Sequence, residues 1–121
     1  MPFVVDFLEG QGVVCLTLIG SITKNELETS RGEVSRALND NTCRRLLIDM
    51  TGAEPQQSLT QDFQFTSELH RHFPAGTSIA IIIPAQETER MKFVKDVASN
   101  RGVKTGIFLD NKSALSWLIG D

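Results

Sequence analysis

The sequence predicts one α/β domain, residues 1–121, in which a five-stranded mixed sheet is covered by four helices. Apolar runs typical of strands alternate with amphipathic segments typical of helices, in the order β-β-α-β-α-β-α-β-α. Strands that are separated by helices pair in parallel through right-handed crossovers. Hydrophobic residues make up 40% of the chain and charged residues 22%, which is typical of a soluble globular domain.

The N-terminal region predicts a β-hairpin. Residues 2–9 form the first strand, with Phe3, Val5 and Phe7 on one face, and residues 13–20 form the second. Only three residues separate these strands, so they are expected to be antiparallel, with the first strand at the edge of the sheet.

A helix is predicted to follow the hairpin. Thr23 and Glu26 fit the S/T-x-x-E capping box that marks a helix start. The apolar stripe of this helix has helical spacing and consists of Leu27, Val34, Ala37 and Leu38.

The middle of the chain predicts two further strand–helix units. Residues 44–50 form the third strand, a turn covers residues 51–57, and a helix runs over residues 58–73. Residues 77–85 are apolar on both faces, as expected of a central parallel strand, and residues 87–101 form the third helix.

The C-terminal region predicts the fifth strand and the last helix. The strand covers residues 104–110, and Asp110 caps a short helix over residues 111–120. Its apolar side consists of Ala114, Leu115 and Leu118.

Charge and hydropathy argue against several classes of partner. The net charge is -3 and no basic run is present, which argues against nucleic acid and against an anionic membrane surface. Asp6 and Glu9 interrupt the N-terminal apolar segment, so it is not a signal peptide. All apolar runs are shorter than the ~20 residues of a membrane-spanning helix. We therefore expect a cytoplasmic protein.

Candidate metal ligands and reactive thiols are few. Cys15 and Cys43 are too few for a disulfide scaffold, and neither has a histidine nearby in sequence. His70 and His72 are two positions apart on a predicted helix, so their side chains point about 200° apart and cannot share one ion. We expect no metal and no cofactor, and no nucleophile–base pair indicates an enzyme.

A ligand site in such a sheet is expected at the carboxyl ends of the parallel strands. The predicted rim of that site consists of Gly20, Ser21, Asp49, Thr51 and Gly52. Acidic residues at this rim already complement the helix dipoles, which argues against a ligand rich in phosphate. Asp49 is expected to end its strand and to accept backbone N–H bonds in the following turn.

Aromatic residues suggest a second candidate surface. On the predicted helix over residues 58–73, apolar groups occupy two faces, which indicates either a helix wedged between neighbours or an exposed patch for a partner or a second copy. A groove for a small apolar or lipid-like ligand near the second and last helices is the alternative. The residues concerned are Phe63, Phe65, Leu69, Phe73 and Trp117.

Four segments together resemble the STAS superfamily, and within it the small bacterial SpoIIAA-like domains. They are "LTLIGSIT", "RRLLIDMTGAEPQQSL", "IAIII" and "RGVKTGIFLDNKSALSWL", and the resemblance covers nearly the whole chain. It implies a mixed sheet with a helix layer and no catalysis. Anti-sigma-factor antagonists in this superfamily bind a kinase-like partner and are switched by phosphorylation of a serine.

Ser58 matches the position of that serine. "DMTG", residues 49–52, matches the end of the strand that precedes it, but Gln57 stands where the family has an aspartate. From the residues alone, Ser58 is a helix N-cap, since Gln61 completes an S-x-x-Q box. A phosphate at a helix start is also electrostatically favourable, so both roles stay open.

The sequence thus predicts a non-enzymatic regulatory or protein-interaction module, with self-association through the helix over residues 58–73 or through the edge strand. A binder of a small apolar ligand is the alternative, and an enzyme is the third hypothesis.

Overall fold

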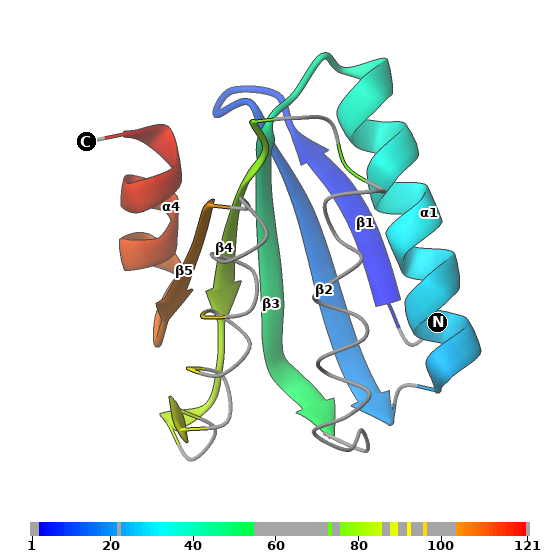
Figure 1. The fold of residues 1–121 in the computed structure, drawn as a ribbon, viewed down its shortest axis with the longest axis vertical. Helices are drawn as coiled ribbons and strands as arrows, with labels where there is room; N and C mark the ends of the chain where they lie inside the picture. Colours follow the sequence, from blue (N-terminus) through cyan, green and yellow to red (C-terminus); the bar gives the residue numbers. More distant parts are fainter. Residues whose placement is uncertain are drawn as a thin grey trace.

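The computed structural model of this protein contains one five-stranded sheet. The order of the strands along the sheet follows the chain, and they are β1 (Phe3–Leu8), β2 (Val13–Ser21), β3 (Arg45–Glu54), β4 (Ser78–Ile82) and β5 (Lys104–Phe108). β1 is antiparallel to β2, and every other neighbouring pair is parallel (Figure 1). The residues that the structure describes are 3–21, 23–54, 73, 76–85, 88–89, 92, 96 and 104–120.

The predicted five-stranded mixed sheet with an antiparallel N-terminal edge strand is confirmed. The described part contains two complete helices, α1 (Lys24–Asp40) and α4 (Asn111–Ile119), rather than the four predicted. Apart from Phe73, the predicted helix over residues 58–73 lies outside the described residues. Within the predicted helix over residues 87–101, the described positions, Thr88, Glu89, Lys92 and Asp96, are helical.

α1 begins at the predicted capping box. The Thr23 hydroxyl accepts a hydrogen bond from the Glu26 backbone N–H at 3.1 Å, and the Glu26 carboxylate accepts one from the Thr23 N–H at 2.9 Å. The predicted apolar stripe faces the sheet. Ser30 is buried beside it, and its hydroxyl is satisfied because it donates to the Leu27 carbonyl. α1 thereby covers β1 and β2.

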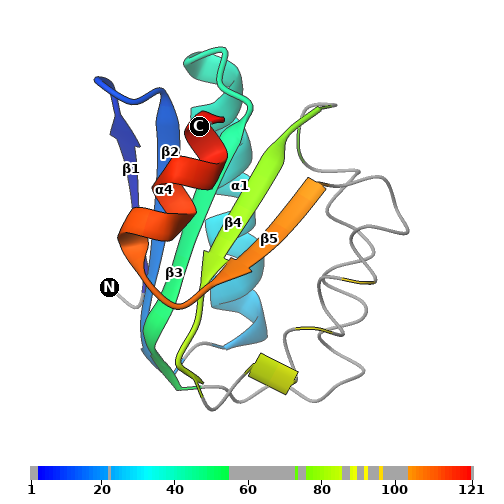
Figure 2. The ribbon, with the colours of Figure 1, turned by 90° about the vertical axis from the view of Figure 1, so that its left-hand side faces the viewer.

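One face of the sheet carries the larger core, which we call the α1-side core. It includes alternate residues of all of the first four strands, together with the inward residues of α1 (Figure 2). Burial of each such leucine or isoleucine contributes about 2 kcal/mol. Its buried residues are Phe3, Val14, Leu16, Leu18, Leu27, Val34, Leu38, Cys43, Leu46, Ile48, Ile79, Ile81 and Ile83.

The opposite face carries a smaller core, which we call the α4-side core. Figure 2 shows α4 in front of the sheet and α1 behind it. α4 packs against β3, β4 and β5. The buried residues of this core are Val13, Leu47, Ala80, Ile82, Ala114 and Leu118.

Gly106 lets the aromatic residues of this face lie close to β5. A Cβ atom at this position would come within 2.7 Å of the Phe108 ring and 3.2 Å of the Trp117 ring. These two rings pack with centroids 5.5 Å apart, and Lys104 Nζ lies 5.3 Å from the Trp117 centroid. A glycine is therefore required here by space.

β3 is longer than predicted, and the prediction that residues 51–57 are all turn is wrong. Thr51 and Gly52 lie in β3, because β2 also continues and pairs Ile19 with Gly52. The register shifts between Thr17 and Ile19, where β3 contains one extra residue. This bulge continues the ladder past Asp49, which sequence reasoning had placed at the end of the strand.

Candidate functional site

The carboxyl ends of β2 and β3 lie side by side, as predicted for the rim of a ligand site. Gly20 pairs with Ala53 and Ser21 pairs with Glu54, so the predicted rim residues Gly20, Ser21 and Gly52 are brought together. Gly20 has a φ of 69°, a left-handed conformation that costs residues with a Cβ atom about 1 kcal/mol or more. The backbone at this rim is therefore open to solvent and shaped by glycine.

Asp49 and Thr51 form a local hydrogen-bonded pair at the bulge. Asp49 Oδ1 accepts from the Thr51 backbone N–H at 3.0 Å and from the Thr51 hydroxyl at 2.6 Å. The expectation that Asp49 accepts a backbone N–H bond is confirmed, but the donor lies within β3 and not in a turn. Asp49 is half-buried on the sheet face that α4 covers in part.

Both complete helices begin with a capping side chain and a carboxylate. The Thr23 hydroxyl accepts from the Glu26 N–H in α1, and Asp110 Oδ1 accepts from the Ser113 N–H at 2.8 Å in α4. Asp110 Oδ2 also accepts from the Ser113 hydroxyl at 3.1 Å. These hydrogen bonds hold the pKa of Asp110 below its ordinary value. The Glu26 and Asp110 carboxylates already complement the helix dipoles, and their negative charge disfavours an anionic ligand.

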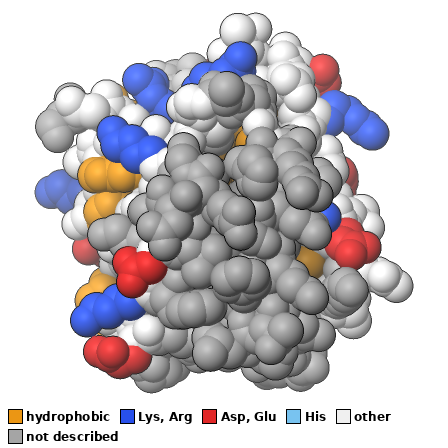
Figure 3. Space-filling view, viewed as in Figure 1, with side chains coloured by type: hydrophobic (Ala, Val, Ile, Leu, Met, Phe, Trp, Pro, Cys, Tyr) orange, Lys and Arg blue, Asp and Glu red, His pale blue; other side chains and the backbone are white. Residues whose placement is uncertain are grey.

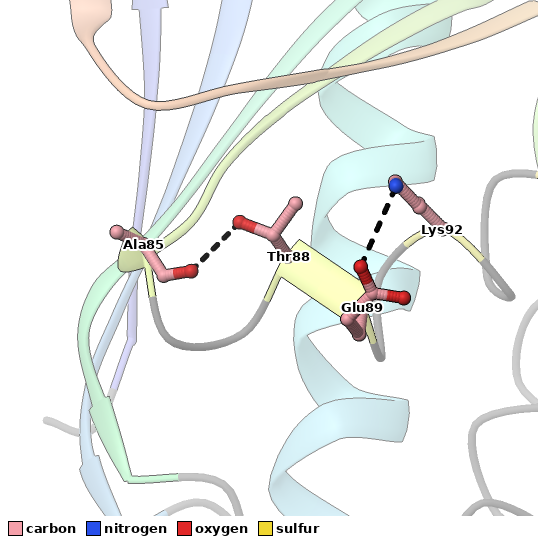
Figure 4. A network of polar contacts seen from close by, with 4 residues as sticks. All are labelled: Ala85, Thr88, Glu89 and Lys92. Atoms are coloured by element: carbon pink, nitrogen blue, oxygen red, sulfur yellow. Dashed lines mark hydrogen bonds and ion pairs between the residues drawn. The ribbon is translucent and has the colours of Figure 1, made fainter.

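A third polar network lies near the rim after β4. Thr88 Oγ1 donates to the Ala85 carbonyl at 2.7 Å, and Lys92 Nζ lies 3.5 Å from Glu89 Oε1 (Figure 4). The ion pair is exposed and spaced i, i+3, so it contributes only about 0.5 kcal/mol. This network is suited to stabilising the helical residues Thr88, Glu89 and Lys92 rather than to binding a ligand.

An aromatic groove was predicted near the second and last helices. This prediction is wrong for Phe73 and Trp117, the two of its residues that the structure describes. Phe73 packs against the α1-side core, whereas Trp117 packs against the α4-side core. The sheet separates them, so they cannot line one groove. The predicted site residues Ser58, Phe63, Phe65 and Leu69 lie outside the described residues, as do His70 and His72.

The two cysteines occupy different environments. Cys43 is buried, and its thiol lies 3.2 Å from the Gly12 carbonyl, to which it donates. Cys15 is half-buried on β2, and burial raises the pKa of its thiol. The Asp49 and Asp6 carboxylates raise this pKa further, while the contact with Thr17 lowers it. Both thiols therefore suit packing better than nucleophilic chemistry.

Figure 3 shows Lys and Arg side chains and Asp and Glu side chains around the margin of one face of the molecule. In the part of the chain that the structure describes, no group of three or more His, Cys, Asp and Glu side chains could hold a metal ion. None of the described helices is both long and apolar enough to cross a membrane.

Sequence reasoning missed one surface feature. Val4 and Ile19 are two of only three exposed large apolar side chains among the described residues, and they lie on the α4 side of the sheet with Asp6 and Thr17. The alternation of residues in "VVCLTLIG" could have indicated this surface. Every second residue from Cys15 belongs to the sheet face opposite that of Leu16 and Leu18.

No protein-family model matches this chain, and no curated protein sequence is significantly similar to it. Solved structures do resemble it. An anti-sigma factor antagonist from Mycobacterium paratuberculosis has a TM-score of 0.66 and 14% identity, and the match covers 96% of this chain and 92% of that chain. An uncharacterised protein of the DUF3478 family with a SpoIIAA-like fold, from Shewanella loihica PV-4, has a TM-score of 0.63 and 18% identity, over 96% of this chain and 91% of that one. The chain therefore has the STAS/SpoIIAA-like fold.

Proposed function

We propose that this protein is a non-enzymatic regulatory module that acts by binding another protein. The observation that carries this proposal is the likeness, over 96% of the chain, to an anti-sigma factor antagonist, a protein that acts on another protein. The capped helix starts add support, because the Glu26 and Asp110 carboxylates disfavour a phosphate-bearing substrate or cofactor. Cytoplasmic localisation is part of the same proposal.

The partner is either a different protein or a second copy of this chain. β1 is the edge strand of the sheet, and an edge strand presents N–H and C=O groups that another chain can bind. We expect Ser58 to cap a helix under most conditions. A phospho-switch at Ser58 would add nearly two negative charges four positions after Glu54 in the sequence and would weaken binding of an acidic partner.

The test is native mass spectrometry of the tagged chain purified from its own cells, with the tag alone as the control. The proposal predicts a protein bound in a fixed ratio and absent from the control. Ser58→Ala should retain the partner and lower the melting temperature by a few degrees, since losing a cap costs about 1 kcal/mol.

Two results would contradict the proposal. One is a small molecule bound in stoichiometric amount with no protein partner. The other is turnover of a substrate by the purified chain, where substitutions in the chain abolish that turnover. A partner that dissociates only from chain phosphorylated at Ser58 would support the proposal and overturn our expectation that Ser58 is only a cap.

A further inference from the structure

The α4 side of the sheet has a covered half and an open half. α4 packs on β3, β4 and β5, and Val13 of β2 and Leu8 of β1 pack in the same core. Further along these two strands, Val4, Asp6 and Ile19 are exposed on this side. We call the open half the open strip and define it as Val4, Asp6, Thr17, Ile19 and Asp49. Val4 pairs with Thr17 across β1 and β2, and Thr17 pairs with Asp49 across β2 and β3.

The open strip carries apolar side chains that are unusually exposed for this protein. Val4 is 41% exposed and Ile19 is 49% exposed. They are diagonal neighbours, because Val4 is opposite Thr17 and Ile19 is two residues further along β2. Diagonal neighbours on one sheet face are about 7 Å apart, so the two side chains form one continuous apolar surface.

The width of the open strip fits one helix. Neighbouring strands are about 4.8 Å apart, so β1 and β2 together with the gap to β3 span roughly 10 Å. A helix with its side chains is about 10 Å in diameter, and packed helices lie 8–10 Å apart. A second helix can therefore lie beside α4 on the same face, in the way that α4 itself covers β3 to β5.

Charge specifies the chemistry of that helix. Asp6 and Asp49 lie at the two edges of the open strip, because Asp6 pairs with Cys15 on β2 and Asp49 pairs with Thr17 from β3. Within the described residues Asp6 accepts no hydrogen bond or ion pair, and Asp49 is bonded only to its neighbour Thr51. The two residues are about 7 Å apart along the strand direction and about 10 Å apart across the strands, so they would lie on opposite flanks of a bound helix, about one turn apart along its axis.

We infer that the open strip binds an amphipathic helix of a partner protein whose apolar face is flanked by Lys or Arg, with the basic side chains about one turn apart. This inference rests on the proposed function, since it names the segment of the partner that is bound. A second copy of this chain fits poorly, because two open strips face to face would oppose like charges.

The test is an NMR titration of the isotope-labelled full chain with a synthetic 18-residue helix of Leu and Ala flanked by Lys. The matched probe is the same peptide with Glu in place of Lys. We expect saturable shifts at Thr17, Ile19 and the β1 amides with the Lys peptide only. The shifts at Asp110 and Ser113, on the rim, should be small.

Two variants with equal net charge separate a specific site from general attraction. Asp6→Asn with Asp49→Asn should weaken binding of the Lys peptide about tenfold, which corresponds to ~1.4 kcal/mol. Glu28→Gln with Glu33→Gln removes two exposed carboxylates from α1 and should change the affinity less than twofold. Equal weakening by both pairs would overturn the inference.

The remaining outcomes are also decisive. Absence of shifts at the open strip, or equal shifts with the Glu peptide, overturns the inference. Shifts at the open strip that depend on protein concentration without peptide indicate a second copy and also overturn it. A native partner that perturbs only the rim would leave the proposed function standing and exclude the open strip as its site.

Discussion

The two faces of the sheet bury adjacent leucines equally but differ in what covers them. Leu46 and Leu47 are consecutive on β3, are 0% and 1% exposed, and point to opposite faces. The α1-side core extends from β1 to β4 and buries Phe3 at the edge strand. The α4-side core includes Val13 on β2 and contacts Leu8 on β1, but Val4, further along β1, is exposed. Among the described residues, exposed apolar surface on the sheet therefore remains on the α4 side.

The largest expected effect tests this difference with the two leucines. Leu46→Ala should cost about 4 kcal/mol of unfolding free energy and Leu47→Ala about 2.5 kcal/mol. The removed atoms are the same, but α4 is a short helix of nine residues, and a short helix can shift to fill part of the cavity. Urea unfolding of both variants measures the difference. A Leu47→Ala cost equal to that of Leu46→Ala would show that both faces are equally rigid.

The next effect compares two glycines, one on each side of the sheet. Gly106→Ala should destabilise the protein by about 1–2 kcal/mol, because the new Cβ would collide with the Phe108 and Trp117 rings. Gly32→Ala is the matched control, since its Cβ meets nothing within 4 Å and alanine favours a helix interior by up to about 1 kcal/mol. Thermal melts should therefore move in opposite directions. A stabilised Gly106→Ala variant would contradict the close packing of these rings.

The third effect concerns the Asp110 cap at the start of α4. The pKa of Asp110 is lowered from 3.8 by its bonds to Ser113, so its carboxylate stabilises the folded chain above that pH, and the stabilisation is lost as the pH falls through the lowered pKa. Asp110→Ala should lower the melting temperature at pH 7, and this deficit should shrink as the pH falls below 3.8. Asn111→Ala, one residue further on, is the control and should change little. A deficit that persists at low pH would mean that the carboxylate charge is not responsible.

Sequence alone predicted the elements whose signals are local. The alternation in β1, the capping box of Thr23 and Glu26, and the Asp110 cap each depend on residues within one element, and the structure confirms them. The length of β3 was not predictable in this way, because residues 51–54 continue the strand only through pairing with β2 across the bulge. Tertiary pairing here overrides the turn propensity of Gly52.

The candidate site was predicted less well than the fold, for a related reason. Gly20, Ser21 and Gly52 meet because parallel strands end together, which topology predicts. Phe73 and Trp117 were assigned to one groove from their aromatic character, but the face to which each residue points depends on the handedness of the connections and on the position of α4. The open strip depends on the alternation in β1 and β2 and on the position of α4 over β3 to β5, and only the alternation can be read from the sequence.

The smallest expected effect concerns Cys15, which lies at the boundary between the covered half and the open strip. Its thiol should react with iodoacetamide more slowly in the folded protein than in urea, because burial is the main cause that raises its pKa above the ordinary value of 9.0. Asp6→Asn with Asp49→Asn should increase the rate only modestly, since the carboxylates are the lesser causes. Peptide mass spectrometry separates this site from Cys43.

The same shift fixes the sign of a stability effect at alkaline pH. The folded chain holds the Cys15 proton at a pH where the unfolded chain has released it, so this contribution to stability is complete below pH 9.0 and is lost as the pH rises through the raised pKa. Cys15→Ala lacks this contribution, and its stability relative to the unmutated chain should improve as the pH rises. If the variant and the unmutated chain lose stability in parallel above that pH, Cys15 is hydrated in solution and the open strip extends further under α4 than its packing indicates.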